Sequence, residues 1–133
     1  MTFIYRISSL SRSEQVHAST SPELAGYETQ VQAHRLYGAL FFGAVKLVED
    51  MEEHLPEQAL VLDLKNLIYI DTSGADSLMA LARTCRKKQV RLILCGVDHQ
   101  PLDMMSRCGL LALLPEQDLR PDLGHGLAAA LGR

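Results

Sequence analysis

Residues 59–74, which read ALVLDLKNLIYIDTSG, decide the fold of this chain. Ala59–Leu64 is an apolar run broken only by Asp63, which is typical of a strand covered on both faces. After the short connection KNLIYI, the letters DTSG open a stretch with apolar residues at helical spacing. A buried strand that leads into an amphipathic helix is the repeating unit of an α/β fold.

The same alternation continues on both sides of this stretch. Val31–Leu36 and Ala39–Phe42 are strand-like runs separated by Tyr37-Gly38, which predicts an antiparallel hairpin. The other apolar patterns predict strands at Val90–Cys95 and Leu111–Leu114, and helices over Ala44–Leu55, Ser73–Lys88, from near Pro101 to Cys108, and Asp122–Leu131. We therefore expect one α/β domain with a mostly parallel central sheet, an antiparallel edge hairpin and about four helices.

Composition narrows the class of protein. Of the 133 residues, 47% are hydrophobic and 22% are charged, the balance of a soluble globular domain. The net charge of −3 and the lack of a basic stripe argue against a nucleic-acid partner. No apolar run reaches the roughly 18 residues of a membrane span, and no signal-peptide pattern is present. Three cysteines that match no metal or redox spacing indicate a reducing, cytosolic compartment; they are Cys85, Cys95 and Cys108.

The first thirty residues differ from the rest of the chain. Residues 8–22 hold six serines and a proline, a composition that favours a linker or an irregular arm. Dense, regular patterning begins at Val31. We therefore assign residues 1–30 to an arm and residues 31–133 to the folded domain.

Catalytic motifs are missing from the sequence. It contains no phosphate-binding loop, no dinucleotide-binding glycine pattern, no metal-binding histidine pair and no nucleophile elbow. The five histidines are scattered, so no joint metal site is expected. We predict that the chain is not an enzyme, with no catalytic residue, no metal and no cofactor.

One segment carries the candidate functional residues, and two interpretations of it stay open. The residues are Asp71, Thr72, Ser73, Gly74 and Asp76. In the structural interpretation, Ser73 or Thr72 caps the helix and Asp76 completes a capping box. In the functional interpretation, the segment is a docking loop with a phosphoacceptor at Ser73, whose phosphate would face the positive end of the helix dipole. The two roles are compatible.

The DTSG segment and its surroundings resemble the STAS family. The similar region runs from about Val31 to Leu114 and includes a second block, VRLILCGVDHQPLDMMSRCGLL, at residues 90–111. This family includes bacterial anti-sigma-factor antagonists and the C-terminal cytosolic domains of SulP anion transporters. The resemblance implies an anti-sigma-factor-antagonist-like fold and a regulatory role by protein–protein interaction.

Two features are similar to the transporter branch of that family. Arg35–Ala44, RLYGALFFGA, resembles a strand that ends in Phe-Phe-Gly before the first helix. The head FIYRISSLSR resembles the end of a last membrane helix and its juxtamembrane stretch, with Arg6 and Arg12 on the cytosolic side. The resemblance thus implies a domain of a sulfate or related anion transporter on the cytoplasmic side of the inner membrane, soluble when isolated.

The implied partners follow from these branches. A transporter domain would dock onto the membrane domain of its own transporter or onto a cytosolic regulatory protein, through the Asp71–Asp76 loop and the following helix. The alternative is a free-standing anti-sigma-factor antagonist switched by phosphorylation at Ser73. The family resemblance also leaves oligomerisation and weak nucleotide binding open.

The capping interpretation predicts a stability change. If Ser73 is the cap, Ser73→Ala lowers the free energy of unfolding by about 1 kcal/mol, and Ser73→Asp lowers it less because aspartate also caps. Urea denaturation measures both. Parent-like unfolding of both variants would place the cap on another residue.

Overall fold

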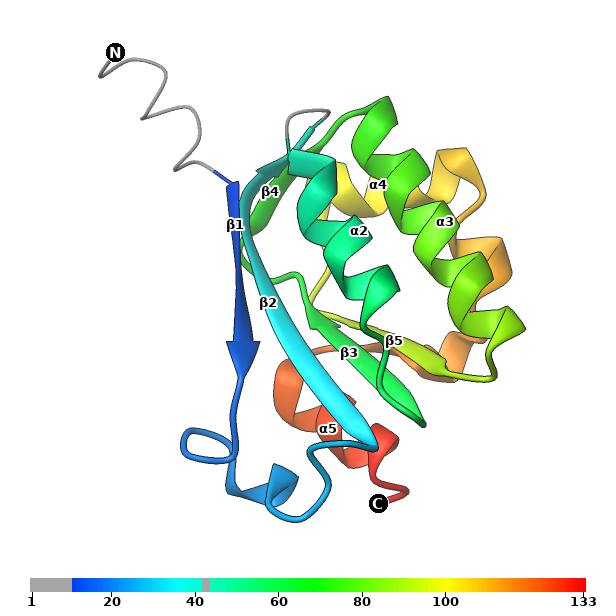
Figure 1. The fold of residues 1–133 in the computed structure, drawn as a ribbon. Coiled ribbons are helices and arrows are strands. Elements are labelled where there is room, and N and C mark those ends of the chain that lie inside the picture. Colours follow the sequence, from blue (N-terminus) through cyan, green and yellow to red (C-terminus); the bar gives the residue numbers. More distant parts are fainter. Residues whose placement is uncertain (1–10, 42–43) are drawn as a thin grey trace.

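The computed structural model describes residues 11–41 and 44–133 (Figure 1). The membrane-helix-like head expected at Met1–Leu10 and the Phe42-Gly43 pair lie outside the described residues. Within the described ranges the predicted α/β class is confirmed, with four α-helices around a mostly parallel sheet.

A six-stranded sheet forms the middle layer of the described chain. Its strand order is β1-β2-β3-β5-β6, and β4 pairs with the C-terminal part of β2. All pairings are parallel except that of β1 with β2. The strands are β1 (Ser11–Val16), β2 (Val31–Leu40), β3 (Ala59–Asp63), β4 (Leu67–Ile70), β5 (Arg91–Cys95) and β6 (Leu119–Arg120).

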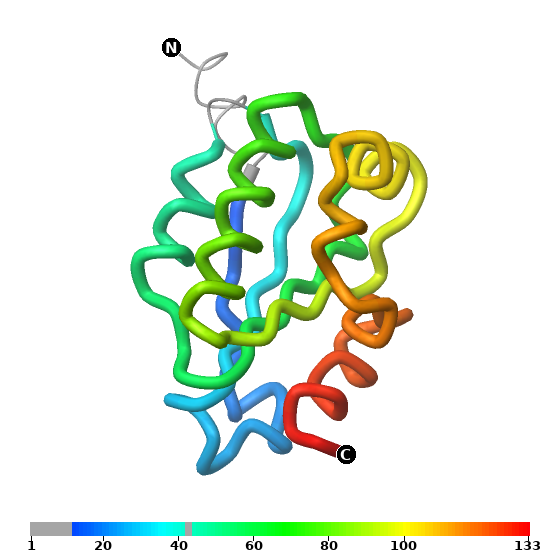
Figure 2. Tube along the Cα trace, turned by 90° about the vertical axis from the view of Figure 1, so that its right-hand side faces the viewer, coloured from blue at the N-terminus to red at the C-terminus, as the bar shows by residue number. Residues whose placement is uncertain are grey.

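Helices cover both faces of this sheet (Figures 1 and 2). The larger core lies under α2, α3 and α4, and a smaller core lies under α5 on the opposite face. The helices are α2 (Val45–Glu53), α3 (Thr72–Lys87), α4 (His99–Cys108) and α5 (Leu123–Ala130), with short 3-10 helices η1 (Pro22–Leu24), η3 (Leu111–Leu113) and η4 (Glu116–Asp118).

Strand β3 is the centre of the fold, as the sequence predicts. All five of its residues are buried. Leu60 and Leu62 point into the larger core, whereas Ala59 and Val61 point into the smaller one. Asp63, the polar exception, is buried at the strand end, where its Oδ2 lies 3.3 Å from Nε of Arg35. The ion pair and the backbone N–H of Lys65 satisfy this carboxylate.

The antiparallel hairpin exists, but the predicted strands were wrong. Val31–Leu40 is one continuous strand that runs through Tyr37-Gly38 with a bulge after Gly38. Its antiparallel partner is β1, which lies in the serine-rich segment expected to be irregular. Val16 and Leu24 from that segment are buried in the smaller core. Residues 11–30 therefore pack onto the sheet.

Strand β1 is held by its backbone pairing with β2, by buried Val16 and by cross-strand polar pairs that an apolar pattern does not reveal. The guanidinium carbon of Arg12 lies 4.2 Å from the centre of the Tyr37 ring. Glu14 accepts hydrogen bonds from Arg35 Nη1 and the Tyr37 hydroxyl, both at 3.4 Å. Charged and polar side chains are common on an edge strand, where they also discourage pairing with other chains.

Three smaller predictions also need correction. The KNLIYI connection contains strand β4, which is too short to show an alternating pattern. Leu111–Leu114 was predicted as a strand, but Leu111–Leu113 is a 3-10 helix and the last strand is β6. Helix α4 begins at His99, before Pro101, and ends at Cys108 as predicted.

The contact between α5 and the sheet generates a test. Gly126 is buried, and a Cβ there would overlap the sulfur of Cys95 and lie 3.1 Å from Cγ1 of Val61. Gly126→Ala should therefore lower the free energy of unfolding by about 1–3 kcal/mol in urea denaturation.

Gly124, on the exposed side of the same helix, is the matched control. A Cβ there meets only the exposed Asp122 side chain at 3.4 Å. Gly124→Ala should leave stability unchanged or raise it by up to about 1 kcal/mol, because alanine favours helix. Equal effects at both positions would contradict the close packing of α5 on the sheet.

Candidate functional site

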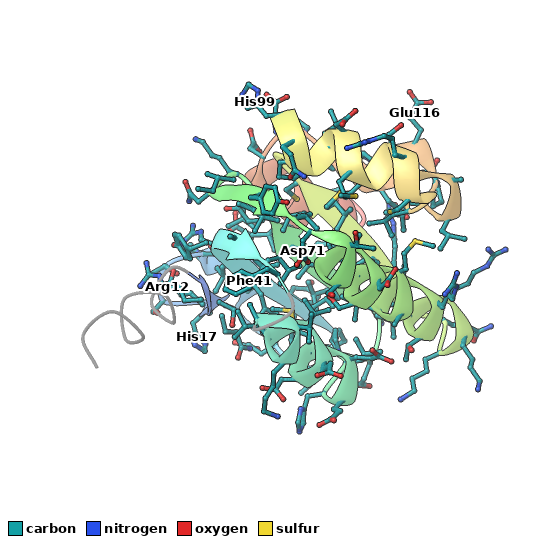
Figure 3. The ribbon with its side chains drawn as sticks, turned by 90° about the horizontal axis from the view of Figure 1, so that it is seen from above. Arg12, His17, Phe41, Asp71, His99 and Glu116 are labelled. Atoms are coloured by element: carbon teal, nitrogen blue, oxygen red, sulfur yellow. The ribbon has the colours of Figure 1, made fainter. Side chains whose placement is uncertain are left out.

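The predicted site residues lie together where β4 leads into α3, at the carboxyl ends of the parallel strands. Figure 3 looks onto this end of the sheet, with Asp71 near its middle. Asp71 has an extended backbone (φ −92°, ψ −177°) and precedes the first helical residue, Thr72. Its Oδ1 accepts a hydrogen bond of 2.8 Å from the backbone N–H of Gly74. Asp71 is therefore the helix cap.

This geometry corrects the capping prediction. Thr72 and Ser73 are the first two residues inside the helix, so neither occupies the cap position. The helix begins at Thr72, one residue before the predicted start at Ser73, so the cap is Asp71 and neither Ser73 nor Thr72. A capping box between Ser73 and Asp76 does not form, because Asp76 lies in the second turn relative to the true cap.

Gly74 permits the closest approach of helix and sheet at the site. A Cβ on Gly74 would overlap the carbonyl oxygen of Leu40, the last residue of β2. The same carbonyl accepts a hydrogen bond of 3.1 Å from the backbone N–H of Asp71. The first turn of α3 is thus held directly against the end of the strand beneath it.

Gln100 fixes the end of β4 through its side chain, and the sequence did not predict this role. Its side-chain amide lies against the backbone of Ile70: Oε1 accepts from the N–H, and Nε2 donates to the C=O, each at 2.8 Å. Gln100 comes from the first turn of α4, thirty residues farther along the chain. Only the folded structure brings the two together, so no local sequence signal could have revealed this clamp.

The exposed part of the site includes two apolar residues that were not predicted. Ile68 is 72% exposed and Tyr69 is 47% exposed, although both lie in strand β4. They are followed by Thr72 and Asp76, which are exposed, and by Ser73, which is half-buried. We call Ile68, Tyr69, Thr72, Ser73 and Asp76 the docking surface.

Two of the three cysteines, Cys85 and Cys95, are buried in the core, whereas Cys108 is half-buried. Burial raises the pKa of the Cys85 thiol to about 11 and that of the Cys95 thiol to about 12, so both are un-ionised at neutral pH. Among residues 11–41 and 44–133, no group of three or more histidine, cysteine or acidic side chains is placed to hold a metal ion. The helices within these ranges are also too short or too polar to cross a membrane.

The chain is similar to a known protein family, to a curated relative and to several solved structures. A family model described as the STAS domain matches residues 28–125. The chain is similar to a putative sulfate transporter, YvdB, of Bacillus subtilis strain 168, with 26% identity over 122 residues. That alignment covers 88% of this chain but 23% of the relative's length, so the chain spans less than a quarter of that protein.

Two solved structures have the same fold. The STAS domain of a SulP transporter from Vibrio cholerae gives a TM-score of 0.64, with 23% identity over 87% of this chain and 96% of that one. The anti-sigma-factor antagonist SpoIIAA in its unphosphorylated form gives a TM-score of 0.69, with 15% identity over 92% of this chain and 97% of that one.

The corrected cap gives a direct prediction. Asp71→Ala should lower the free energy of unfolding by about 1 kcal/mol, because the Gly74 N–H loses its acceptor. Asp71→Asn should retain most of the stability, since asparagine caps as well as aspartate. Chemical denaturation measures both.

Ser73→Ala is the matched control on the neighbouring helix turn, and it should change stability by less than about 0.5 kcal/mol. A larger loss for Ser73→Ala than for Asp71→Ala would show that the cap is assigned to the wrong residue.

Proposed function

Because this chain belongs to the STAS domain family, we propose that it is a non-catalytic regulatory and interaction domain of a SulP-type transporter of sulfate or a related anion. The similarity to a putative sulfate transporter over most of this chain supports the transporter branch. The protected thiols are consistent with a domain that binds partners and does no chemistry.

The docking surface is the proposed point of contact, and the exposure of Ile68 is the observation that carries this proposal. Ile68 is 72% exposed, so covering its side chain with another surface would contribute favourable free energy. Tyr69 adds an aromatic ring with a polar tip, a residue type enriched at interfaces. The Gln100 clamp holds the backbone of the adjoining Ile70, so both side chains are presented on a fixed element.

The pairing of the strands places the beginning of the described chain at the same end of the sheet as the docking surface. Ser11 and Leu67 both pair with Gly38, from opposite sides of β2. Figure 1 shows the start of β1 at the same end of the sheet as β4 and the first turn of α3. A membrane domain that precedes residue 11 would therefore lie at the same end of the sheet as the docking surface. We propose that this membrane domain is the partner, on the cytoplasmic side of the inner membrane.

A second candidate function is partner switching by phosphorylation of Ser73. It is favoured by the fold shared with SpoIIAA and by the place of Ser73, half-buried in the first turn of α3. A phosphate there would add negative charge between Asp71 and Asp76 and so disturb any partner bound to the docking surface. Intact mass after incubation with the kinase fraction of the host cell tests it: a single phosphate lost in Ser73→Ala supports the switch, and no modification contradicts it.

The docking proposal predicts a position-specific loss of transport. In the full-length transporter, Tyr69→Asp should lower sulfate uptake into membrane vesicles about tenfold, because a charge replaces the ring at the proposed interface. Tyr27→Asp is the matched control. Tyr27 is 42% exposed, close to the 47% of Tyr69, but it lies at the opposite end of β2.

Uptake by the Tyr27→Asp variant should remain at the parent level. Parent-level uptake by Tyr69→Asp, with both variants folded and present in the membrane in equal amounts, would exclude the docking surface as the contact.

A further inference from the structure

The C-terminal end of α3 carries four cationic side chains that have no ion-pair partner among the described residues. Arg83, Arg86, Lys87 and Lys88 are all exposed. The ion pairs of the described chain involve other cations, such as Arg35, Arg91 and Arg107. The negative end of the helix dipole offsets part of this charge. Four neighbouring cations still repel one another and attract anions to this end of the helix.

An open cleft of about 430 Å³ is lined by one of these cations, Arg86. Its walls come from the last turns of α3, the start of β5 and the segment that carries η3, and these elements lie side by side in Figure 2. Arg86 lines the cleft together with the apolar residues Ala82, Val90, Leu113, Leu114 and Pro115. A cleft lined by both apolar and cationic side chains is suited to a ligand that is partly apolar and negatively charged.

Arg91 also lines the cleft, but its guanidinium is hydrogen-bonded within the fold. Its Nε donates to Oδ1 of buried Asp118 at 2.6 Å, and its Nη1 donates to the carbonyl oxygen of Ala129 at 2.9 Å. The guanidinium therefore ties η4 and the end of α5 to the start of β5. The Arg91 guanidinium is thus used within the fold, and Arg86 is the other cation that lines the cleft.

We propose that this cleft binds an acidic segment of a partner protein, with an apolar side chain between α3 and η3 and carboxylates on the cationic rim. A single small carboxylate would need only Arg86, whereas the cations extend from Arg83 to Lys88. The neighbouring helix α2 exposes Glu49, Asp50 and Glu53, so the positive strip is narrow. A nucleic-acid duplex or a flat anionic membrane would meet these carboxylates as well, and a narrow acidic segment would not.

This inference is independent of the proposed function. The cleft lies at the end of α3 opposite the docking surface, and a helix of 16 residues is about 24 Å long. Both surfaces can therefore be occupied at the same time.

Binding of a designed acidic probe tests the proposal. The probe is a fluorescein-labelled peptide of glutamate, aspartate and serine that carries two leucines one helical turn apart. Its anisotropy is measured with the chain at about 0.15 M salt. Saturable binding should weaken about tenfold or more in the Arg86→Glu, Lys87→Glu double variant, because two attractions become repulsions. Replacing the two leucines of the probe by serine should weaken binding as well, because the cleft loses its apolar side chain.

The matched control is the double variant Lys46→Glu, Lys65→Glu, which changes the net charge equally. Lys46 lies in the first turn of α2 and Lys65 follows the end of β3, whereas the cleft lies at the start of β5. This control should bind the peptide within about twofold of the parent, since salt at about 0.15 M screens exposed charges that are far from the cleft. Circular dichroism and urea denaturation confirm that both double variants fold.

Three results would overturn the proposal. One is equal weakening by the control variant, which would indicate unspecific charge attraction. Another is stronger binding to phosphatidylglycerol vesicles than to the peptide. The last is self-association of the chain that the Arg86→Glu, Lys87→Glu variant abolishes, which would assign the cleft to a second copy.

Discussion

The contact between the first turn of α3 and the end of β2 is the constraint on which the site depends. The carbonyl group of Leu40 accepts the N–H of Asp71, and the missing side chain of Gly74 lets the helix approach that carbonyl. Asp71 then caps the helix at the Gly74 N–H. The segment Asp71–Gly74 thus follows strand β4, begins helix α3 and fixes the distance between α3 and the end of β2. The packing alone accounts for Asp71 and Gly74 in the DTSG segment, without any partner.

The same constraint determines what the segment can present to a partner. Asp71 and Gly74 are used within the fold, so the surface available for recognition consists of their neighbours, above all Ile68 and Tyr69. Gln100 holds the end of β4 from the other side, and the entry strand β1 pairs at the same end of β2. The proposed contact therefore combines the exposed residues of β4 with Thr72 and Ser73 of the motif, while Asp71 and Gly74 hold the helix in place.

The sequence predicted the elements whose residues are buried on a regular period. Strands β3 and β5 and helix α3 were recognised because apolar side chains fill one or both of their faces. It failed where pairing depends on distant partners: β1 is held by pairs such as Arg12 with Tyr37, and β4 is too short for a pattern. The residues of the DTSG segment lie together at the start of α3, and their docking role stays a prediction. The cap was expected at Ser73 or Thr72 and is Asp71, and neither Gln100 nor exposed Ile68 could be recognised before the fold was known.

Helix α3 joins two surfaces of different character, an apolar and hydroxyl-bearing one at its start and a cationic cleft at its end. The role of the first surface is tested most directly by amide hydrogen exchange, comparing the isolated chain with the full-length transporter in a membrane. Docking through this surface predicts slower exchange in the transporter for amides of residues 67–77, with unchanged exchange around Tyr27. Unchanged exchange over residues 67–77, with new protection elsewhere on the domain, would contradict it.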